Sequence, residues 1–218
     1  MTAVRVAPER LDGWVRRFAA SHGEVARSTD RATSPSSCLL TAADGSWARL
    51  TSWTDAPVDD PPGAAWEPGE WARPPALLVV LVRRGGYAAA VVSPDGSLLA
   101  HKVGTRHVQS RTAAGGWSQQ RFARRRANQA DVLVDAVAGH AARVLAEGEA
   151  AGGQVGGLVL GGDRRLTAAA LEELATGALG RLHRIPRRDL PDLPDPRRAV
   201  LDDAVGRARA VLVEVVNA

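Results

Sequence analysis

Apolar and polar residues follow two different periods along this chain, and the change of period separates the expected helices from the expected strands. Residues 8–22 place apolar side chains at helical spacing and are followed by Gly23, a residue that commonly ends helices. Two apolar runs, 38–41 and 47–53, flank Asp44-Gly45, which is a strong hairpin signal. The first 56 residues therefore predict a small annex of one helix and one β-hairpin.

Proline is concentrated in residues 57–75. Such a composition favours an extended connector over a packed helix or strand. We therefore expect three parts, namely the annex (1–56), a proline-rich connector (57–75) and a second domain (76–218).

The second domain begins with three apolar runs, 77–82, 87–92 and 98–103, separated by short turns that contain glycine. Short connections of this kind predict an antiparallel meander of three strands. From about residue 119 to residue 147, apolar residues recur with a helical period, which predicts one long helix.

The rest of the chain continues the alternation of strands and helices. Residues 155–160 predict a buried strand, 167–176 a helix, 181–185 a short strand and 196–216 a final helix. The resulting order β-β-β-α-β-α-β-α is that of a mixed sheet with helices on its faces. We therefore predict an α/β (α+β) domain with a ribonuclease H-like fold.

Positive charge is concentrated in one segment. The chain has 28 basic and 24 acidic residues, but residues 96–130 contain seven basic residues and no carboxylate. Clustered arginine attracts polyanions and matches the geometry of phosphate, so this segment favours RNA binding. The alternative is an ordinary solvated helix face in an arginine-rich protein, since all but one of the basic residues are arginine.

Composition excludes several classes of protein. The single cysteine, Cys38, rules out an internal disulfide and a zinc site built from several cysteines. The apolar runs are much shorter than the roughly 20 residues needed to cross a bilayer, and no secretion signal is present at the N-terminus. We expect a cytoplasmic protein without a metal or cofactor, and without a membrane or DNA as partner.

The segment from Gly115 to Arg126 reads GGWSQQRFARRR. It resembles the Gly-Gly-Gln loop and following helix in the central domain of eukaryotic and archaeal class-one release factors. Trp117 stands where those factors carry their catalytic glutamine. The chain is therefore more similar to the Vms-like release factors, in particular to their actinobacterial branch of peptidyl-tRNA hydrolases, which carry the glutamine earlier in the loop. The resemblance covers residues 77–217 in element order and is sequence-specific between Lys102 and Gln129.

This resemblance implies an enzyme that hydrolyses the ester bond between a nascent peptide and tRNA on stalled or split ribosomes. Its partners would be peptidyl-tRNA and the large ribosomal subunit with its RNA. The implied catalytic residue is Gln109, with Gln119 and Gln120 as alternatives. The implied loop backbone consists of Gly104, Thr105, Gly115, Gly116, Trp117 and Ser118.

These residue types suit the chemistry. A glutamine amide both donates and accepts hydrogen bonds, so it can position water and stabilise the developing oxyanion without titrating. Basic residues would hold RNA phosphates. The candidates for this role are Lys102, Arg106, Arg111, Arg121, Arg124, Arg125 and Arg126. Trp117 could stack on a base or anchor the core.

Two alternatives stay open. A non-catalytic ribosome- or tRNA-binding adaptor would explain Trp117 as the mark of a lost active site. A metal-dependent nuclease of ribonuclease H-like fold would use the carboxylates Asp95, Asp131, Asp135 and Asp163. The triplet 161–163 lacks the ending of a phosphate-binding loop, and therefore favours a tight turn.

Overall fold

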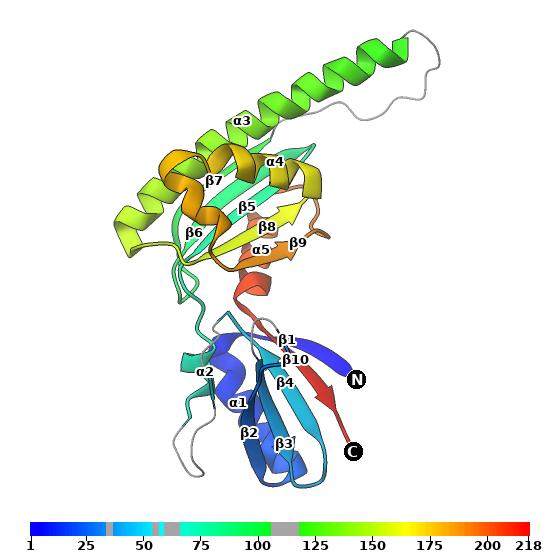
Figure 1. Cartoon of the computed structure of the whole chain (residues 1–218), viewed down its shortest axis with the longest axis vertical. Helices are drawn as coiled ribbons and strands as arrows, with labels where there is room; N and C mark the ends of the chain where they lie inside the picture. The colour runs from blue at the N-terminus through cyan, green and yellow to red at the C-terminus, as the bar shows by residue number, and fades with distance from the viewer. Residues whose placement is uncertain (34–36, 54–56, 59–65, 106–117) are drawn as a thin grey trace. The chain divides into compact units, whose positions relative to one another are not determined.

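A computed structural model describes residues 1–33, 37–53, 57–58, 66–105 and 118–218, with residues 118–128 described as helical backbone. The chain forms two compact units (Figure 1). Unit 1 comprises Met1–Pro74 together with Gly206–Ala218, and unit 2 comprises Pro75–Val205.

Unit 2 is built on a five-stranded mixed sheet with the order β7-β6-β5-β8-β9. The first three strands pair antiparallel as a meander, whereas β8 pairs parallel with β5 and β9 pairs parallel with β8. The strands are β5 (Leu77–Arg83), β6 (Gly86–Val92), β7 (Leu98–Thr105), β8 (Gly157–Gly162) and β9 (Arg187–Leu190). The meander and the mixed sheet are those predicted from the apolar runs.

Strands β5, β6 and β8 are almost entirely buried. Their continuous apolar runs are typical of strands that are covered on both faces. One core joins Leu78, Val80 and Val82 of β5 to residues of two helices, α3 (Ser118–Gly152) and α4 (Arg164–Leu174), which pack against each other and over the sheet (Figure 1). Unit 2 therefore has the mixed sheet and flanking helices of the predicted ribonuclease H-like fold.

One strand of unit 2 is shifted from its predicted position. Residues 181–185, expected to be a strand, belong mainly to the 3-10 helix η1 (Gly177–His183), and the strand follows as β9. Leu182, in the middle of this range, is 1% exposed and belongs to the core formed with α3 and α4. A short run with one buried residue does not distinguish a strand from a helical turn.

Unit 1 has a five-stranded antiparallel sheet with the order β1-β10-β4-β3-β2. Helix α1 (Pro8–His22) packs on one face through Leu11 and Phe18, and the four-residue helix α2 (Pro68–Trp71) contacts α1. The strands are β1 (Thr2–Val6), β2 (Val25–Asp30), β3 (Ser37–Ala42), β4 (Trp47–Thr51) and β10 (Val211–Val216). The predicted helix and the β3–β4 hairpin are confirmed.

The final helix predicted over 196–216 is wrong beyond Arg209. Helix α5 (Arg198–Arg209) ends there, and β10 pairs with β1 and β4, which are both distant from it in the sequence. Val211 and Val213 are fully buried on the α1 side of the sheet, and Leu212 is 38% exposed. This alternation fits a strand, but the same valines also fit a helical stripe when β10 is considered without its partners.

Candidate functional site

The segment that contains the predicted catalytic glutamine connects β7 to α3. Residues 106–117 lie outside the described residues. This set includes the predicted site residues Arg106, Gln109, Arg111, Gly115, Gly116 and Trp117. Their roles stay predictions, whereas both elements that carry the segment are described.

The remaining predicted site residues lie on these two elements. Gly104 and Thr105 are the last residues of strand β7, although the sequence suggested that they belong to the loop. Ser118 begins α3, and the first three turns of that helix contain Gln119, Gln120, Arg121, Arg124, Arg125 and Arg126. Position 121 is therefore about one helical turn from both 124 and 125.

Helix α3 is 35 residues long, which corresponds to about 52 Å. Its N-terminal part extends beyond the sheet (Figure 1). Among its described side chains, the first that is fully buried is Leu133, about 22 Å along the helix axis from Ser118. Among the residues of α3 whose side chains are described, those from Ala130 onward anchor the helix in the core.

Strands β6 and β7 and helix α3 pack together where α3 lies against the sheet. The buried Tyr87 ring of β6 stacks on the His140 ring of α3, with centroids 5.1 Å apart and an interplanar angle of 13°. A Cβ atom at Gly104 would lie 2.4 Å from Cζ of Tyr87, a distance that no real contact allows. Gly104 therefore lets the end of β7 lie directly against Tyr87.

The C-terminal half of α3 lies equally close to the sheet. A Cβ atom at Gly148 would lie 2.3 Å from Cβ of Val91 in β6, whereas one at Gly139 would meet nothing within 4 Å. Gly148 thus sets a short distance between helix and sheet. Such packing fixes the direction in which the N-terminal part of α3 projects.

Lys102 is exposed on β7, an edge strand of the unit 2 sheet, opposite Ala89 in the register. Three residues separate it from the segment 106–117. Lys102 is therefore exposed close to this segment, and its contact with an RNA phosphate stays a prediction.

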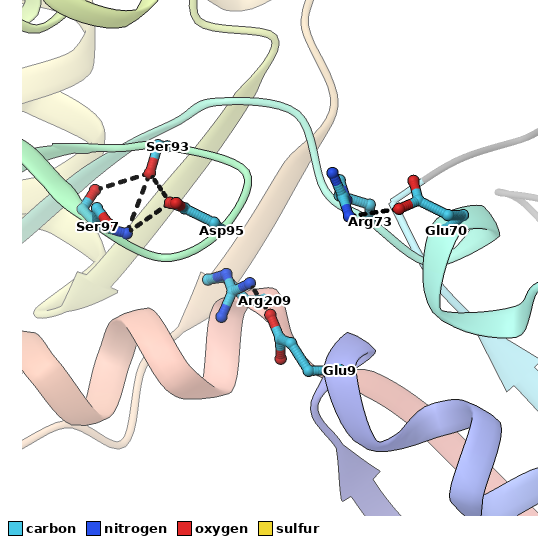
Figure 2. A network of polar contacts seen from close by, with 7 residues as sticks. All are labelled: Glu9, Glu70, Arg73, Ser93, Asp95, Ser97 and Arg209. Atoms are coloured by element: carbon cyan, nitrogen blue, oxygen red, sulfur yellow. Dashed lines mark hydrogen bonds and ion pairs between the residues drawn. The ribbon is translucent and has the colours of Figure 1, made fainter.

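The four carboxylates of the nuclease alternative do not all lie on one element, and two of them, Asp95 and Asp163, accept hydrogen bonds within turns or helix caps. Asp95 accepts hydrogen bonds from the Ser93 hydroxyl and the Ser97 backbone in the turn between β6 and β7 (Figure 2). Asp131 and Asp135 are exposed on α3. Within the described part of the chain, no three histidine, cysteine or carboxylate side chains form a group that could hold a metal ion. The four carboxylates do not form the cluster that this alternative requires.

Asp163 caps α4. Its Oδ1 accepts hydrogen bonds from the backbone N–H groups of Arg165 and Leu166, at 3.0 and 3.2 Å. Gly162 has a φ of +98°, and a Cβ atom there would lie 2.3 Å from the carbonyl oxygen of Val82. The triplet 161–163 is therefore a tight turn with a helix cap, as its sequence favoured.

A cavity of about 170 Å³ opens beside this turn, at the carboxyl ends of β8 and β9. Arg164, Thr167, Arg187 and Asp189 contribute its polar lining. Arg187 and Asp189 form an ion pair across 3.3 Å. Sequence reasoning missed this cavity because its two arginines are 23 positions apart, although the Arg164-Arg165 pair directly after a buried strand was a usable signal.

Two carboxyl groups with clearly shifted pKa values lie in unit 1. Burial raises the pKa of Glu9. Hydrogen bonds from Arg209 and from the backbone, together with the charges of Arg209 and Arg73, lower it by a larger amount, so the net pKa of Glu9 falls below its ordinary value (Figure 2). The pKa of Asp44 is lowered by a hydrogen bond from the Ser46 backbone and by His22, whose Nδ1 lies 2.8 Å away. Both groups therefore remain ionised through structural contacts.

The family model described as the Actinobacteria/chloroflexi VLRF1 release factor matches residues 75–214, which include β5 to β9 with α3, α4 and α5. No curated protein matches the chain. Along the described residues, no helix is both long and apolar enough to span a membrane.

Proposed function

Because the chain belongs to the actinobacterial and chloroflexi VLRF1 release factor family, we propose that it hydrolyses the ester bond of peptidyl-tRNA on stalled or split ribosomes. Membership of this family gives the protein a role in translation termination or ribosome rescue. Beyond this role, hydrolysis of the ester, peptidyl-tRNA as the substrate and the residues that catalyse the reaction are what we propose.

One observation carries the proposal. The family match spans the segment GGWSQQRFARRR at residues 115–126, and the structure places the second part of this segment at the start of the long helix α3. A helix that extends beyond its sheet can bring a short segment at its N-terminus to a deeply recessed ester (Figure 1). This geometry supports a role for residues 106–117 in contacting the tRNA terminus.

Gln109 is the proposed catalytic residue. Its amide oxygen would accept a hydrogen bond from the attacking water, and its amide N–H would donate to the carbonyl oxygen as negative charge develops there. Water oxygen bonds to the carbonyl carbon, the bond to the ribose oxygen breaks, and that oxygen takes a proton from the water. An ester to ribose is activated enough for positioning to supply much of the rate. Gln119 and Gln120 are the alternatives in the same region.

The basic residues would hold RNA rather than take part in chemistry. Arg124 and Arg125 follow Arg121 by three and four positions on α3, about one helical turn, so contacts to the same stretch of phosphate backbone are proposed for all three. The large ribosomal subunit and the tRNA are the proposed partners, and the cytoplasm is the proposed compartment because ribosomes work there.

A second candidate function is a ribosome-binding adaptor without catalysis. Trp117 favours it, because the residue after the Gly-Gly pair is not the glutamine that class-one release factors use. An adaptor would bind the same RNA through the same arginines, so binding alone does not separate the two functions.

Release of a labelled peptide separates them. Purified protein is mixed with large ribosomal subunits that carry peptidyl-tRNA, and the single-turnover release rate is measured at saturating protein. We expect wild-type protein to release the peptide, and Gln109→Ala to lower the rate by about 100-fold or more while binding stays unchanged. Gln119→Ala and Gln120→Ala test the two alternative glutamines in the same assay.

The outcomes show separately whether the protein hydrolyses peptidyl-tRNA and which glutamine is catalytic. Tight binding with no release by wild-type protein would establish the adaptor. Full release by Gln109→Ala, with loss of release in Gln119→Ala or Gln120→Ala, would move catalysis to that glutamine and leave the function intact.

A further inference from the structure

The segment 106–117 leaves the unit 2 sheet at an edge that carries further arginines. β5, β8 and β9 run parallel, and β7 runs in the same direction because both β5 and β7 pair antiparallel with β6. The carboxyl ends of all four strands therefore lie at one edge of the sheet. Thr105, the last residue of β7, lies at this edge with the ends of β5, β8 and β9.

Positive charge at this edge exceeds what its own carboxylates neutralise. Arg84, Arg164 and Arg165 are exposed, and no carboxylate among the described residues forms an ion pair with any of them. Two other arginines there are paired. Arg83 lies 3.4 Å from Asp195 and also donates to the Leu193 carbonyl at 2.5 Å, and Arg187 pairs with Asp189.

The edge is also hollowed, by the cavity at the ends of β8 and β9. Arg164 enters its lining from α4 and Arg187 from β9. Two guanidinium groups against the single carboxylate of Asp189 leave the lining with a net positive charge. A volume of about 170 Å³ is sufficient for a phosphate group with its ester oxygens, but small for a whole nucleotide.

The N-terminus of α4 does not supply the binding groups. Asp163 already accepts the N–H groups of Arg165 and Leu166, and the carbonyl of Asp163 accepts from Thr167 N and Oγ1. An anion in the cavity would therefore be held by the guanidinium groups of Arg164 and Arg187. Arginine donates to phosphate through two parallel N–H bonds, so these two side chains suit that ligand.

We propose that this cavity binds a backbone phosphate of RNA, and that the arginine edge extends the RNA-contact surface of α3 along the carboxyl ends of the sheet. The identity of the RNA as ribosomal RNA or tRNA rests on the proposed function. The site itself rests on the cavity, its two arginines and the unpaired arginines beside it.

A charge-matched pair of variants tests this site. Arg164→Gln/Arg187→Gln removes both guanidinium groups of the cavity. Arg10→Gln/Arg184→Gln removes two exposed arginines elsewhere, Arg10 on α1 of unit 1 and Arg184 before the amino end of β9. Affinity for purified large ribosomal subunits is measured over a salt series, and thermal unfolding checks that both variants fold.

Loss of one phosphate contact should weaken binding about fivefold to tenfold at 0.1 M salt and lower the salt slope by about one. We expect this effect in Arg164→Gln/Arg187→Gln and not in the control. Equal affinities and equal slopes in the two variants would overturn the proposal.

Two further measurements complete the test. Phosphate binding distinguishes an RNA phosphate from free phosphate, and peptide release distinguishes failure of this inference from failure of the proposed function. Inorganic phosphate that raises the unfolding temperature of wild-type protein but not of Arg164→Gln/Arg187→Gln, with unchanged subunit binding, would assign the cavity to a free phosphate and overturn the RNA assignment. Peptide release at saturating protein should be the same for both variants. If wild-type protein releases no peptide but the cavity variant still loses RNA affinity, the proposed function fails and this inference stands.

Discussion

Gly104 of β7 lies directly against Tyr87 of β6, because a side chain at position 104 would occupy the space of the Tyr87 ring. Tyr87 in turn stacks on His140 of α3. The end of β7, the centre of the sheet and the long helix are thus joined through one buried ring.

Replacement of Gly104 by alanine should disturb this contact. The new Cβ atom would lie 2.4 Å from Cζ of Tyr87, so the ring must move away from His140. We expect a loss of about 1–3 kcal/mol in the free energy of unfolding, measured with urea. Tyr87→Phe keeps the ring and should stay near wild-type stability. Equal stability of Gly104→Ala and wild-type protein would contradict this packing.

Two glycines of α3 should respond to the same substitution with opposite signs. Gly148→Ala places a methyl group 2.3 Å from Cβ of Val91 and should destabilise unit 2 by about 1–3 kcal/mol. Gly139→Ala meets no atom within 4 Å and should stabilise the helix by about 0.5–1 kcal/mol. Thermal unfolding of the two variants compares them directly, and a shift of the same sign in both would refute the close contact of α3 with β6.

Alternate residues of β10 should contribute very differently to unit 1. Val213 is fully buried against α1, so Val213→Ala should cost about 2 kcal/mol of unfolding free energy. Leu212 is 38% exposed on the other face, and Leu212→Ala should change stability by less than about 0.5 kcal/mol. A helix through residue 216, as the sequence suggested, would not produce this alternation. Urea unfolding of both variants is the measurement.

The ion pair between Glu9 and Arg209 should make unit 1 sensitive to acid. The folded-state pKa of Glu9 lies below its ordinary value of 4.5, so the carboxylate contributes stability above pH 4.5 that is lost as the pH falls below it. Glu9 is 55% exposed, so the contribution should stay within about 1 kcal/mol. The unfolding free energy of Glu9→Gln should therefore equal that of wild-type protein at low pH and fall below it at pH 7. A difference that persists at pH 3 would exclude this ionic origin.

Arginines on α3 should affect RNA affinity without affecting the chemical step. Arg124→Ala/Arg125→Ala removes two proposed phosphate contacts and should lower the salt slope of subunit binding by about two. At saturating protein, the peptide release rate should match that of wild-type protein. Arg10→Ala/Arg184→Ala gives the matched control. A lower release rate at saturation would mean that these residues also position the reacting groups.

Several elements could be predicted from local pattern because their partners are close in the sequence. The apolar runs of β5, β6 and β7 are separated by turns of a few residues, and their pairing follows from these short connections. The long helix was visible in its period, although it continues to Gly152.

Other elements depend on distant partners. Strands β1 and β2 carry little apolar patterning, and β1 is mostly exposed, so they are strands because β10 and β3 offer them hydrogen-bond partners. The cavity arginines come from α4 and β9, and only the parallel pairing of β8 with β9 brings them together. No local signal encodes such a relationship.

The sequence by itself determined the meander, the long basic helix and the family resemblance, because each depends on residues that are neighbours along the chain or one helical turn apart. Tertiary structure alone decided that residues 211–216 form a strand beside β1 and β4. It also decided that Arg164 of α4 and Arg187 of β9 line one cavity. The physical reason is that β10 forms its backbone hydrogen bonds, and buries Val211 and Val213, with partners more than 150 residues away in the sequence. These partners override a local pattern that a helix would satisfy equally well.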